Sequence, residues 1–194
     1  DQLNGGAGVD TASYLLATTG VSINLNTSTH AGEAAFDTFV SIERFQLSNG
    51  FSLVDNFNGS INADWVAGYK GVDNLNGLAG ADTLNGGEHN DVIDGGADND
   101  KLIGGTGNDS LTGGTGADQF WANAGLFGAD TVNDFENGVD KVRLTGISGV
   151  TSFANLTITT NGGGWAVITL PDGSSITLTG ITAGQVDASD FLFA

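Results

Sequence analysis

Aspartate recurs every nine residues through the middle of this chain, and that period constrains the fold more than any other feature. A glycine stands five positions before each aspartate, and an apolar residue stands two positions after it. The eight aspartates in phase are Asp55, Asp64, Asp73, Asp82, Asp91, Asp100, Asp109 and Asp118. A fixed short period is the signature of a solenoid, because a single repeat cannot bury an apolar face alone. We therefore predict one elongated body over this region.

The two most regular units read GGTGNDSLT over residues 104–112 and GGTGADQFW over residues 113–121. Both follow the pattern Gly-Gly-x-Gly-x-Asp-x-apolar-x, which resembles the calcium-binding nonapeptide of the RTX, or haemolysin-type, family. The resemblance covers residues 50–121. It implies an all-β parallel β-roll, in which two nonamers make one 18-residue coil with a sheet on each side.

The period divides the chain into three parts. We predict a degenerate N-terminal part of the roll at 1–49, the regular calcium-binding roll at 50–121, and a C-terminal β-rich cap at 122–194. Residues 14–49 are expected to bind no metal, because Thr19, Ser28 and Gln46 stand where aspartate should. In the cap, alternating apolar residues predict strands at 156–160, 165–170 and 175–181, and residues 191–193 suit a last edge strand. The first four residues match the end of a nonamer and indicate a piece of a longer protein.

Stacking of unit n on unit n+2 should gather the aspartates in two columns. Carboxylates about 4.8 Å apart, the spacing of adjacent strands, repel by about 3 kcal/mol at an effective dielectric of about 20. A hard cation that takes about six to eight oxygens would relieve this repulsion, and Ca²⁺ suits such a site better than Mg²⁺. We expect about four to six Ca²⁺ ions. Besides the eight aspartates, the predicted metal-site residues are Gly86, Gly87, Gly95, Gly96, Gly104, Gly105, Gly107, Gly113, Gly114, Gly116 and Asp134.

Composition narrows the partners. Twenty-three acidic residues against five basic ones give a formal charge of -18, which excludes ordinary nucleic-acid and anionic-membrane binding. No cysteine is present, so disulfides and thiolate metal sites are impossible. No stretch has the roughly 18 apolar residues of a membrane span. The resemblance implies a secreted, extracellular module of a Gram-negative bacterium that leaves through a type I exporter and folds on calcium outside the cell.

Catalysis and carbohydrate binding are the two alternatives to a calcium-binding module. Catalysis within these residues is not expected, because His30 and His89 sit in no recognisable motif, although a missing N-terminal part of the parent protein could be an enzyme. The alternative is a calcium-dependent adhesive or carbohydrate-binding module of a surface protein or an extracellular polysaccharide-modifying enzyme. Trp65, Tyr69 and Trp121 could stack on sugars, but we expect them to cover the ends of the thin core. A polyanionic sugar would also need bases, and Lys70 and Lys101 are nearly alone on the roll.

Overall fold

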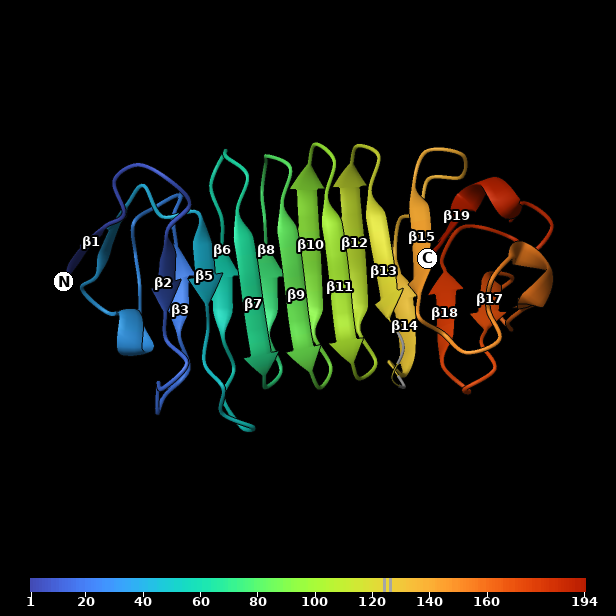
Figure 1. Ribbon diagram of the computed structural model, residues 1–194, viewed down its shortest axis with the longest axis horizontal. Coiled ribbons are helices and arrows are strands. Elements are labelled where there is room, and N and C mark those ends of the chain that lie inside the picture. The colour runs from blue at the N-terminus through green and yellow to red at the C-terminus, as the bar shows by residue number, and fades with distance from the viewer. Residues whose placement is uncertain (124, 126) are drawn as a thin grey trace.

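Two long sheets face each other along the whole molecule in the computed structural model, which describes residues 1–123, 125 and 127–194. Figure 1 shows the strands stacked side by side along the long axis, with the N-terminus at one end and the last strands at the other. The predicted all-β parallel roll is confirmed. Within the described residues, the only helices are the single 3₁₀ turns η1 (Gly32–Ala34), η2 (Phe153–Asn155) and η3 (Ala188–Asp190).

The two sheets take alternate strands of the chain. One sheet contains, in spatial order, β2 (Thr11–Ser13), β5 (Arg44–Gln46), β7 (Trp65–Lys70), β9 (Thr83–Glu88), β11 (Lys101–Thr106), β13 (Gln119–Asn123), β15 (Lys141–Thr145) and β19 (Phe191–Phe193). We call it the odd sheet, because all its strands except β2 have odd numbers. The other contains β3 (Ser22–Asn24), β6 (Asn56–Asn58), β8 (Asn74–Asn76), β10 (Val92–Ala97), β12 (Ser110–Thr115), β14 (Ala129–Val132), β18 (Ser175–Leu178), β17 (Ala166–Thr169) and β16 (Thr157–Thr160). A separate pair joins β1 (Gln2–Asn4) to β4 (Thr38–Val40).

The regular strands pair in parallel with an offset of 18 residues. Ile93 of β10 lies beside Leu111 of β12, and Leu84 of β9 lies beside Leu102 of β11. In Figure 1 the arrows of β9 and β11 point down while those of β10 and β12 point up, so each coil crosses from one sheet to the other and back. The expected stacking of unit n on unit n+2 is therefore confirmed.

The strands are longer than the pattern indicates. We expect three-residue strands after six-residue turns, yet β9, β10, β11 and β12 each contain six residues. The ladder continues through the glycines, where Gly96 pairs with Gly114 and Gly87 pairs with Gly105. An ideal Cβ on Gly105 would lie 2.0 Å from the carbonyl oxygen of Gly87, so only glycine lets neighbouring coils approach this closely.

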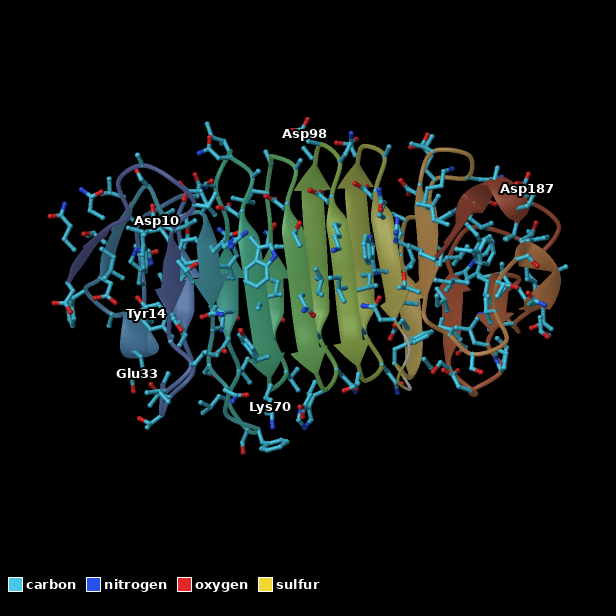
Figure 2. The ribbon with its side chains drawn as sticks, viewed as in Figure 1. Asp10, Tyr14, Glu33, Lys70, Asp98 and Asp187 are labelled. Carbon is cyan, nitrogen blue, oxygen red and sulfur yellow. The ribbon has the colours of Figure 1, made fainter. Side chains whose placement is uncertain are left out.

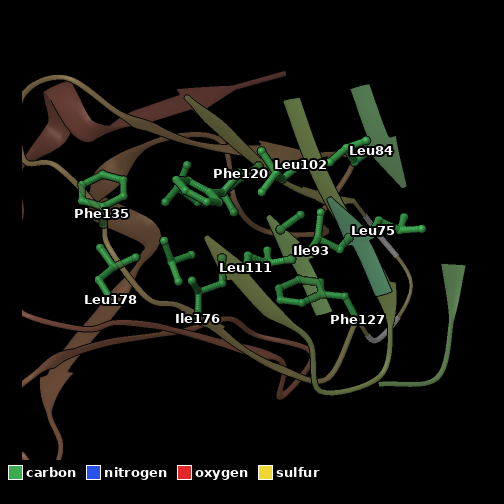
Figure 3. Close-up of a cluster of buried hydrophobic side chains, with 14 of the residues drawn as sticks. Leu75, Leu84, Ile93, Leu102, Leu111, Phe120, Phe127, Phe135, Ile176 and Leu178 are labelled. Atoms are coloured by element: carbon green, nitrogen blue, oxygen red, sulfur yellow. The ribbon is translucent and has the colours of Figure 1, made fainter. Parts of the chain in front are cut away.

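The core is thin, with one side chain from each regular unit. Each regular unit places its middle strand residue between the sheets and points the flanking residues outward. These inward residues are at most 3% exposed and form two facing rows, one from each sheet (Figure 3). One row comprises Leu84, Leu102 and Phe120 of the odd sheet, and the other comprises Leu75, Ile93 and Leu111. Because neighbouring rungs touch only each other, every rung is needed to keep the sheets together.

Residues 14–49 continue both sheets with a longer connection. The alternation predicts strands there, and Val21, Ile23, Phe45 and Leu47 are buried at 0 to 1% exposure. β3 joins β6 in one sheet and β5 joins β7 in the other, so this part belongs to the same body as the regular roll. The division at residue 50 stays a prediction about where regular repeats begin.

The C-terminal part closes the roll with antiparallel strands. β18 pairs in parallel with β14, and β17 and β16 follow it as an antiparallel meander. The three strands predicted there are confirmed, each shorter at one or both ends. The last residues form β19 beside β15, as expected for an edge strand. These strands cover the last apolar rungs, where Phe120 packs against Phe135 with ring centroids 6.2 Å apart.

A thin core should make single rungs costly to remove. Ile93→Ala opens a cavity between the sheets and should lower the free energy of unfolding by about 2 to 4 kcal/mol. The neighbouring Val92 is 49% exposed, so Val92→Ala should cost under about 1 kcal/mol. Urea unfolding at saturating calcium measures both variants. Equal losses of stability would contradict a core in which each unit contributes one inward side chain.

Candidate metal centre

Aspartates of successive coils form two ladders held by the backbone. In each ladder the backbone N–H of one aspartate donates to Oδ1 of the aspartate one coil further on. Asp73 donates to Asp91 and Asp82 donates to Asp100, both at 2.8 Å. The first ladder contains Asp55, Asp73, Asp91, Asp109 and Asp130, and the second contains Asp64, Asp82, Asp100, Asp118 and Asp140. The two ladders lie on opposite edges of the roll, because the strands they precede run in opposite directions (Figure 1).

The second carboxylate oxygen of the inner ladder members has no hydrogen-bond donor. This Oδ2 atom is buried and without a partner among the described residues in six aspartates. They are Asp73, Asp82, Asp91, Asp100, Asp109 and Asp118. Buried polar atoms in folded proteins almost always have a partner, and a bare carboxylate oxygen away from water is costly. Six equivalent oxygens of this kind fit a bound cation.

The first glycine of each unit makes room for the orphan oxygen. An ideal Cβ on Gly86 would lie 2.1 Å from Oδ2 of Asp91, so the carboxylate folds back over the glycine of its own unit. At Gly77 the same point is approached by Oδ2 of Asp82 at 2.1 Å and by the carbonyl oxygen of Gly95 at 2.6 Å. A carboxylate oxygen and a backbone carbonyl of the next coil thus meet at the turn.

The remaining predicted glycines shape the turns. Positive φ angles occur at the second glycine of each regular unit and at the fourth-position glycines, where side chains are disfavoured. These are Gly87, Gly96, Gly105, Gly107, Gly114 and Gly116. His89 and Asp98 adopt φ of 87° and 79° at the fourth position, as expected for residue types that tolerate this backbone. Figure 2 shows the Asp98 turn and the Lys70 turn on opposite edges of the roll.

Burial raises the pKa values of the six inner ladder carboxyls. It raises the pKa of Asp91 to about 8 and those of Asp73, Asp82 and Asp100 to about 7. Neighbouring carboxylates raise the pKa of Asp91 further, but less than burial does, while the N–H from Asp73 lowers it. From the sequence we predicted that repulsion along the column destabilises the ionised carboxylates. Loss of water is the larger cause, because each aspartate accepts an N–H from its neighbour that offsets the like charge.

The ends of the predicted set have protein donors instead. Both oxygens of Asp55 accept backbone N–H groups at 2.7 Å, from Val21 and Ser48. Oδ2 of Asp64 accepts from the backbone N–H and hydroxyl of Ser60. Exposed Asp134 accepts from the N–H groups of Gly113 and Gly114 at 2.9 and 2.8 Å. The inner six aspartates are thus better placed to hold a cation than these three, and the ligand assignments stay predictions.

Two ladder members lie outside the predicted set. Asp130 and Asp140 are 6% and 3% exposed and accept the N–H groups of Asp109 and Asp118 at 3.0 and 2.9 Å. They follow their partners by 21 and 22 residues, so they are out of phase with the nine-residue period. The signal that could have identified them is local, since each is followed two residues later by a buried valine, as in the repeats.

The arrangement suits calcium. In the residues that the structure describes, no three His, Cys, Asp or Glu side chains gather into a metal cluster. Each ion would therefore combine at most two carboxylates with backbone carbonyls of the glycine turns. Hard oxygen ligands in a flexible number favour Ca²⁺, whereas Mg²⁺ demands a small, regular octahedron and keeps its waters.

The side chains of the two histidines take no part in the ladder hydrogen bonds described above. Nδ1 of His30 accepts the backbone N–H of Asn24 at 3.2 Å, and its ring packs edge-on against Phe39. His89 contacts the ring of Phe51 at an exposed turn. Neither contact resembles a nucleophile with its base.

Comparison with known proteins identifies the repeats. The model of the RTX calcium-binding nonapeptide repeat, in four copies, matches residues 49–84, 67–102 and 94–126. The repeat region therefore belongs to the RTX calcium-binding nonapeptide repeat family and is a calcium-binding module. No curated protein sequence matches the chain. Within the described residues, no helix has the length and apolar character needed to cross a membrane.

Solved structures with a similar arrangement include a lipase and two subunits of an epimerase. The extracellular lipase LipA from Serratia marcescens is 16% identical over 76% of this chain, with a TM-score of 0.41, and this chain covers 41% of the lipase. The AlgE6R3 subunit of the Azotobacter vinelandii mannuronan C5-epimerase is 26% identical, with 75% of this chain and 81% of that subunit covered and a TM-score of 0.45. The AlgE6R2 subunit is 24% identical, with coverage of 73% and 91% and a TM-score of 0.39.

Removal of one inner carboxylate should weaken calcium binding selectively. Asp100 takes part in two steps of its ladder, so Asp100→Asn should raise the calcium midpoint of folding roughly two- to tenfold. Asp98→Asn removes the same charge from the same turn, but Asp98 is exposed and keeps its backbone angle as asparagine, so it should shift the midpoint by less than about twofold. Calcium titration followed by circular dichroism measures both. Equal shifts would show that net charge, not the ladder, controls binding.

Protonation of the inner ladder carboxyls should partly replace calcium in stabilising the fold. The six inner ladder carboxyls have raised pKa values, up to about 8 for Asp91, against 3.8 ordinarily. Protonation therefore stabilises that fold at low pH, and the stabilisation is lost as pH rises through about 6 to 8. In chelator, the β signal in circular dichroism should be greater near pH 5.5 than near pH 8, whereas calcium-saturated protein should change little. A signal in chelator that grows with pH would contradict the buried ladders.

Proposed function

We propose that this chain is a calcium-switched folding module that supports secretion and stability of a larger extracellular protein. The observation that carries the proposal is the set of six buried Oδ2 atoms that have no donor among the described residues. One orphan oxygen for each ion supports about four to six Ca²⁺ ions. Bound calcium supplies positive charge to these oxygens, and the chain supplies the ladders and glycine turns that hold it.

The free energy of folding depends on these ions. Extracellular modules bind calcium with dissociation constants of about 10⁻⁴ to 10⁻³ M. At a tenfold excess over the dissociation constant each ion adds about 1.4 kcal/mol, so five ions add about 7 kcal/mol. That is comparable to the whole stability of a typical domain, about 5 to 15 kcal/mol. At cytosolic calcium levels this gain nearly vanishes.

The switch suits passage out of a cell. A chain of formal charge -18 with a thin core should stay unfolded where calcium is scarce. An unfolded chain can pass a narrow type I exporter, and calcium outside a Gram-negative bacterium would then fold it. Calcium also provides the cross-links that a chain without cysteine lacks.

A second candidate function is adhesive or carbohydrate binding. One observation favours it: Trp65, Tyr69 and Trp121 do not cover the ends of the core as we expected. They lie half-buried on the outer face of the odd sheet, where they line one groove. The parent protein could then be a surface protein or a polysaccharide-modifying enzyme.

Calcium should drive folding cooperatively. After chelation the chain should lose its β signal and become protease-sensitive, and calcium added to millimolar levels should restore both in one steep transition. Magnesium at the same concentration should restore little, because it keeps its waters. A chain that stays β-structured and protease-resistant in chelator near pH 8 would contradict the proposed switch.

A further inference from the structure

The basic residues of this acidic chain all lie on strands of the odd sheet. Arg44 belongs to β5, Lys70 to β7, Lys101 to β11, and Lys141 and Arg143 to β15. Their strand neighbours Phe45, Leu102, Val142 and Leu144 are buried at 0 to 2% exposure. Because side chains alternate along a strand, Arg44, Lys101, Lys141 and Arg143 point to the outer face of this sheet. Lys70 and Lys101 are the two basic residues of the regular roll at 50–121, and β5 and β15 bring Arg44 and Arg143 to the same sheet.

Two of these cations meet at one tryptophan. The Nζ of Lys101 lies 3.5 Å from the ring centroid of Trp121, and the guanidinium carbon of Arg143 lies 4.4 Å from it. They come from β11 and β15, the two strands that flank β13. Burial lowers the pKa of Lys101, and the nearby charge of Arg143 lowers it further. The fold therefore gathers two positive charges around one indole.

These cations have no acidic partner despite the excess of acid. Among the described residues, the side-chain ion pair of the roll is Lys70 with Glu88 at 3.6 Å, and no carboxylate oxygen lies within 4.0 Å of Lys101, Arg143 or Arg44. Nε of Arg143 is buried and has no hydrogen-bond acceptor in the same part of the chain. A cluster of cations without counter-charge in a chain of 23 acidic residues indicates a site for an external anion.

A groove runs across the same face. It has a volume of about 430 Å³ and crosses β7, β9, β11 and β13, with Trp65 near one end and Trp121 near the other. Three strand spacings separate these tryptophans, roughly 14 Å, which a short oligosaccharide spans. Tyr69 and Asn85 add polar groups to the lining, and so does Glu88, whose carboxylate is paired with Lys70 at 3.6 Å.

The position of the groove argues against a peptide ligand. Extended peptides usually bind by adding a strand to a sheet edge, where backbone groups are free. The strands under this groove are paired on both sides within the odd sheet. Recognition must therefore use side chains alone, and aromatic, amide and cationic side chains suit sugar rings that carry acidic groups.

We propose that the outer face of the odd sheet binds an anionic polysaccharide. Lys101 and Arg143 bind its carboxylate or sulfate groups, and the groove between Trp65 and Trp121 receives its sugar rings. The inference rests on the proposed function, since the face exists only in the folded roll. Calcium has a second role here: five ions would bring the formal charge from -18 to about -8 and so weaken the repulsion of a polyanion.

Binding assays on the whole chain in millimolar calcium test this proposal. The probes are hyaluronan as a carboxylated glycan, heparin as a sulfated glycan, dextran as a neutral glycan and polyglutamate as an acidic peptide. At least one anionic glycan should bind more tightly than dextran and polyglutamate, and the two anionic glycans together show which acidic group is preferred. Absence of glycan binding by the folded chain, or tighter binding of polyglutamate, would overturn the proposal.

Matched variants locate the site. Lys101→Gln and Arg143→Gln should each weaken glycan binding by about tenfold, the effect of one charge-assisted contact. Lys70→Gln removes the same charge, but Lys70 lies at the turn beside Glu88 (Figure 2) and should change affinity less than about twofold. Equal losses in all three would reduce the effect to net charge and overturn the assigned face. Circular dichroism in calcium reports separately on folding, so failure of the calcium switch and failure of glycan binding are distinguishable.

Discussion

The hydrogen bond from the backbone N–H of one aspartate to Oδ1 of the aspartate one coil further on determines most of this structure. It fixes the 18-residue register, and it holds each carboxylate inside the turn of its own unit. The same bond leaves Oδ2 buried without a donor in six aspartates, Asp91 among them. The ladder therefore satisfies the backbone N–H groups of the aspartates but leaves one oxygen of each inner carboxylate without a donor among the described residues. A bound cation would compensate the charge of these oxygens.

The rest of the chain is consistent with that dependence. The core is thin and the chain has no cysteine, so the fold has little other stabilisation when the ladder carboxyls are ionised. Glycine occupies the positions where a Cβ would strike either the carboxylate, as at Gly86, or the coil below, as at Gly105. We therefore propose that folding is linked to calcium and to protons through the same oxygens. Each of the eight predicted ligand aspartates immediately precedes a strand, which leaves the outer face of the odd sheet free to carry basic residues.

The sequence predicted what the period encodes. The two columns, the parallel register and the inward rung residues such as Ile93 follow directly from nine-residue spacing. Asp130 and Asp140 were missed because insertions shift them out of phase, although they occupy equivalent places in three dimensions. The basic face was missed for a similar reason: Arg44 and Arg143 lie far apart in irregular parts of the chain, and only the stacking of β5 to β15 brings them to one surface. The dominant effect of burial on the ladder carboxyls also depends on packing, which spacing alone does not give.

A crystal structure grown in calcium, with anomalous difference density used to locate the ions, tests the central claim most directly. We expect calcium peaks about 2.3 to 2.6 Å from Oδ2 of the inner aspartates, including Asp73, Asp82, Asp91 and Asp100, with glycine carbonyl oxygens completing the coordination. The account would be contradicted if these Oδ2 atoms were hydrogen-bonded to water or protein donors and the calcium peaks lay elsewhere.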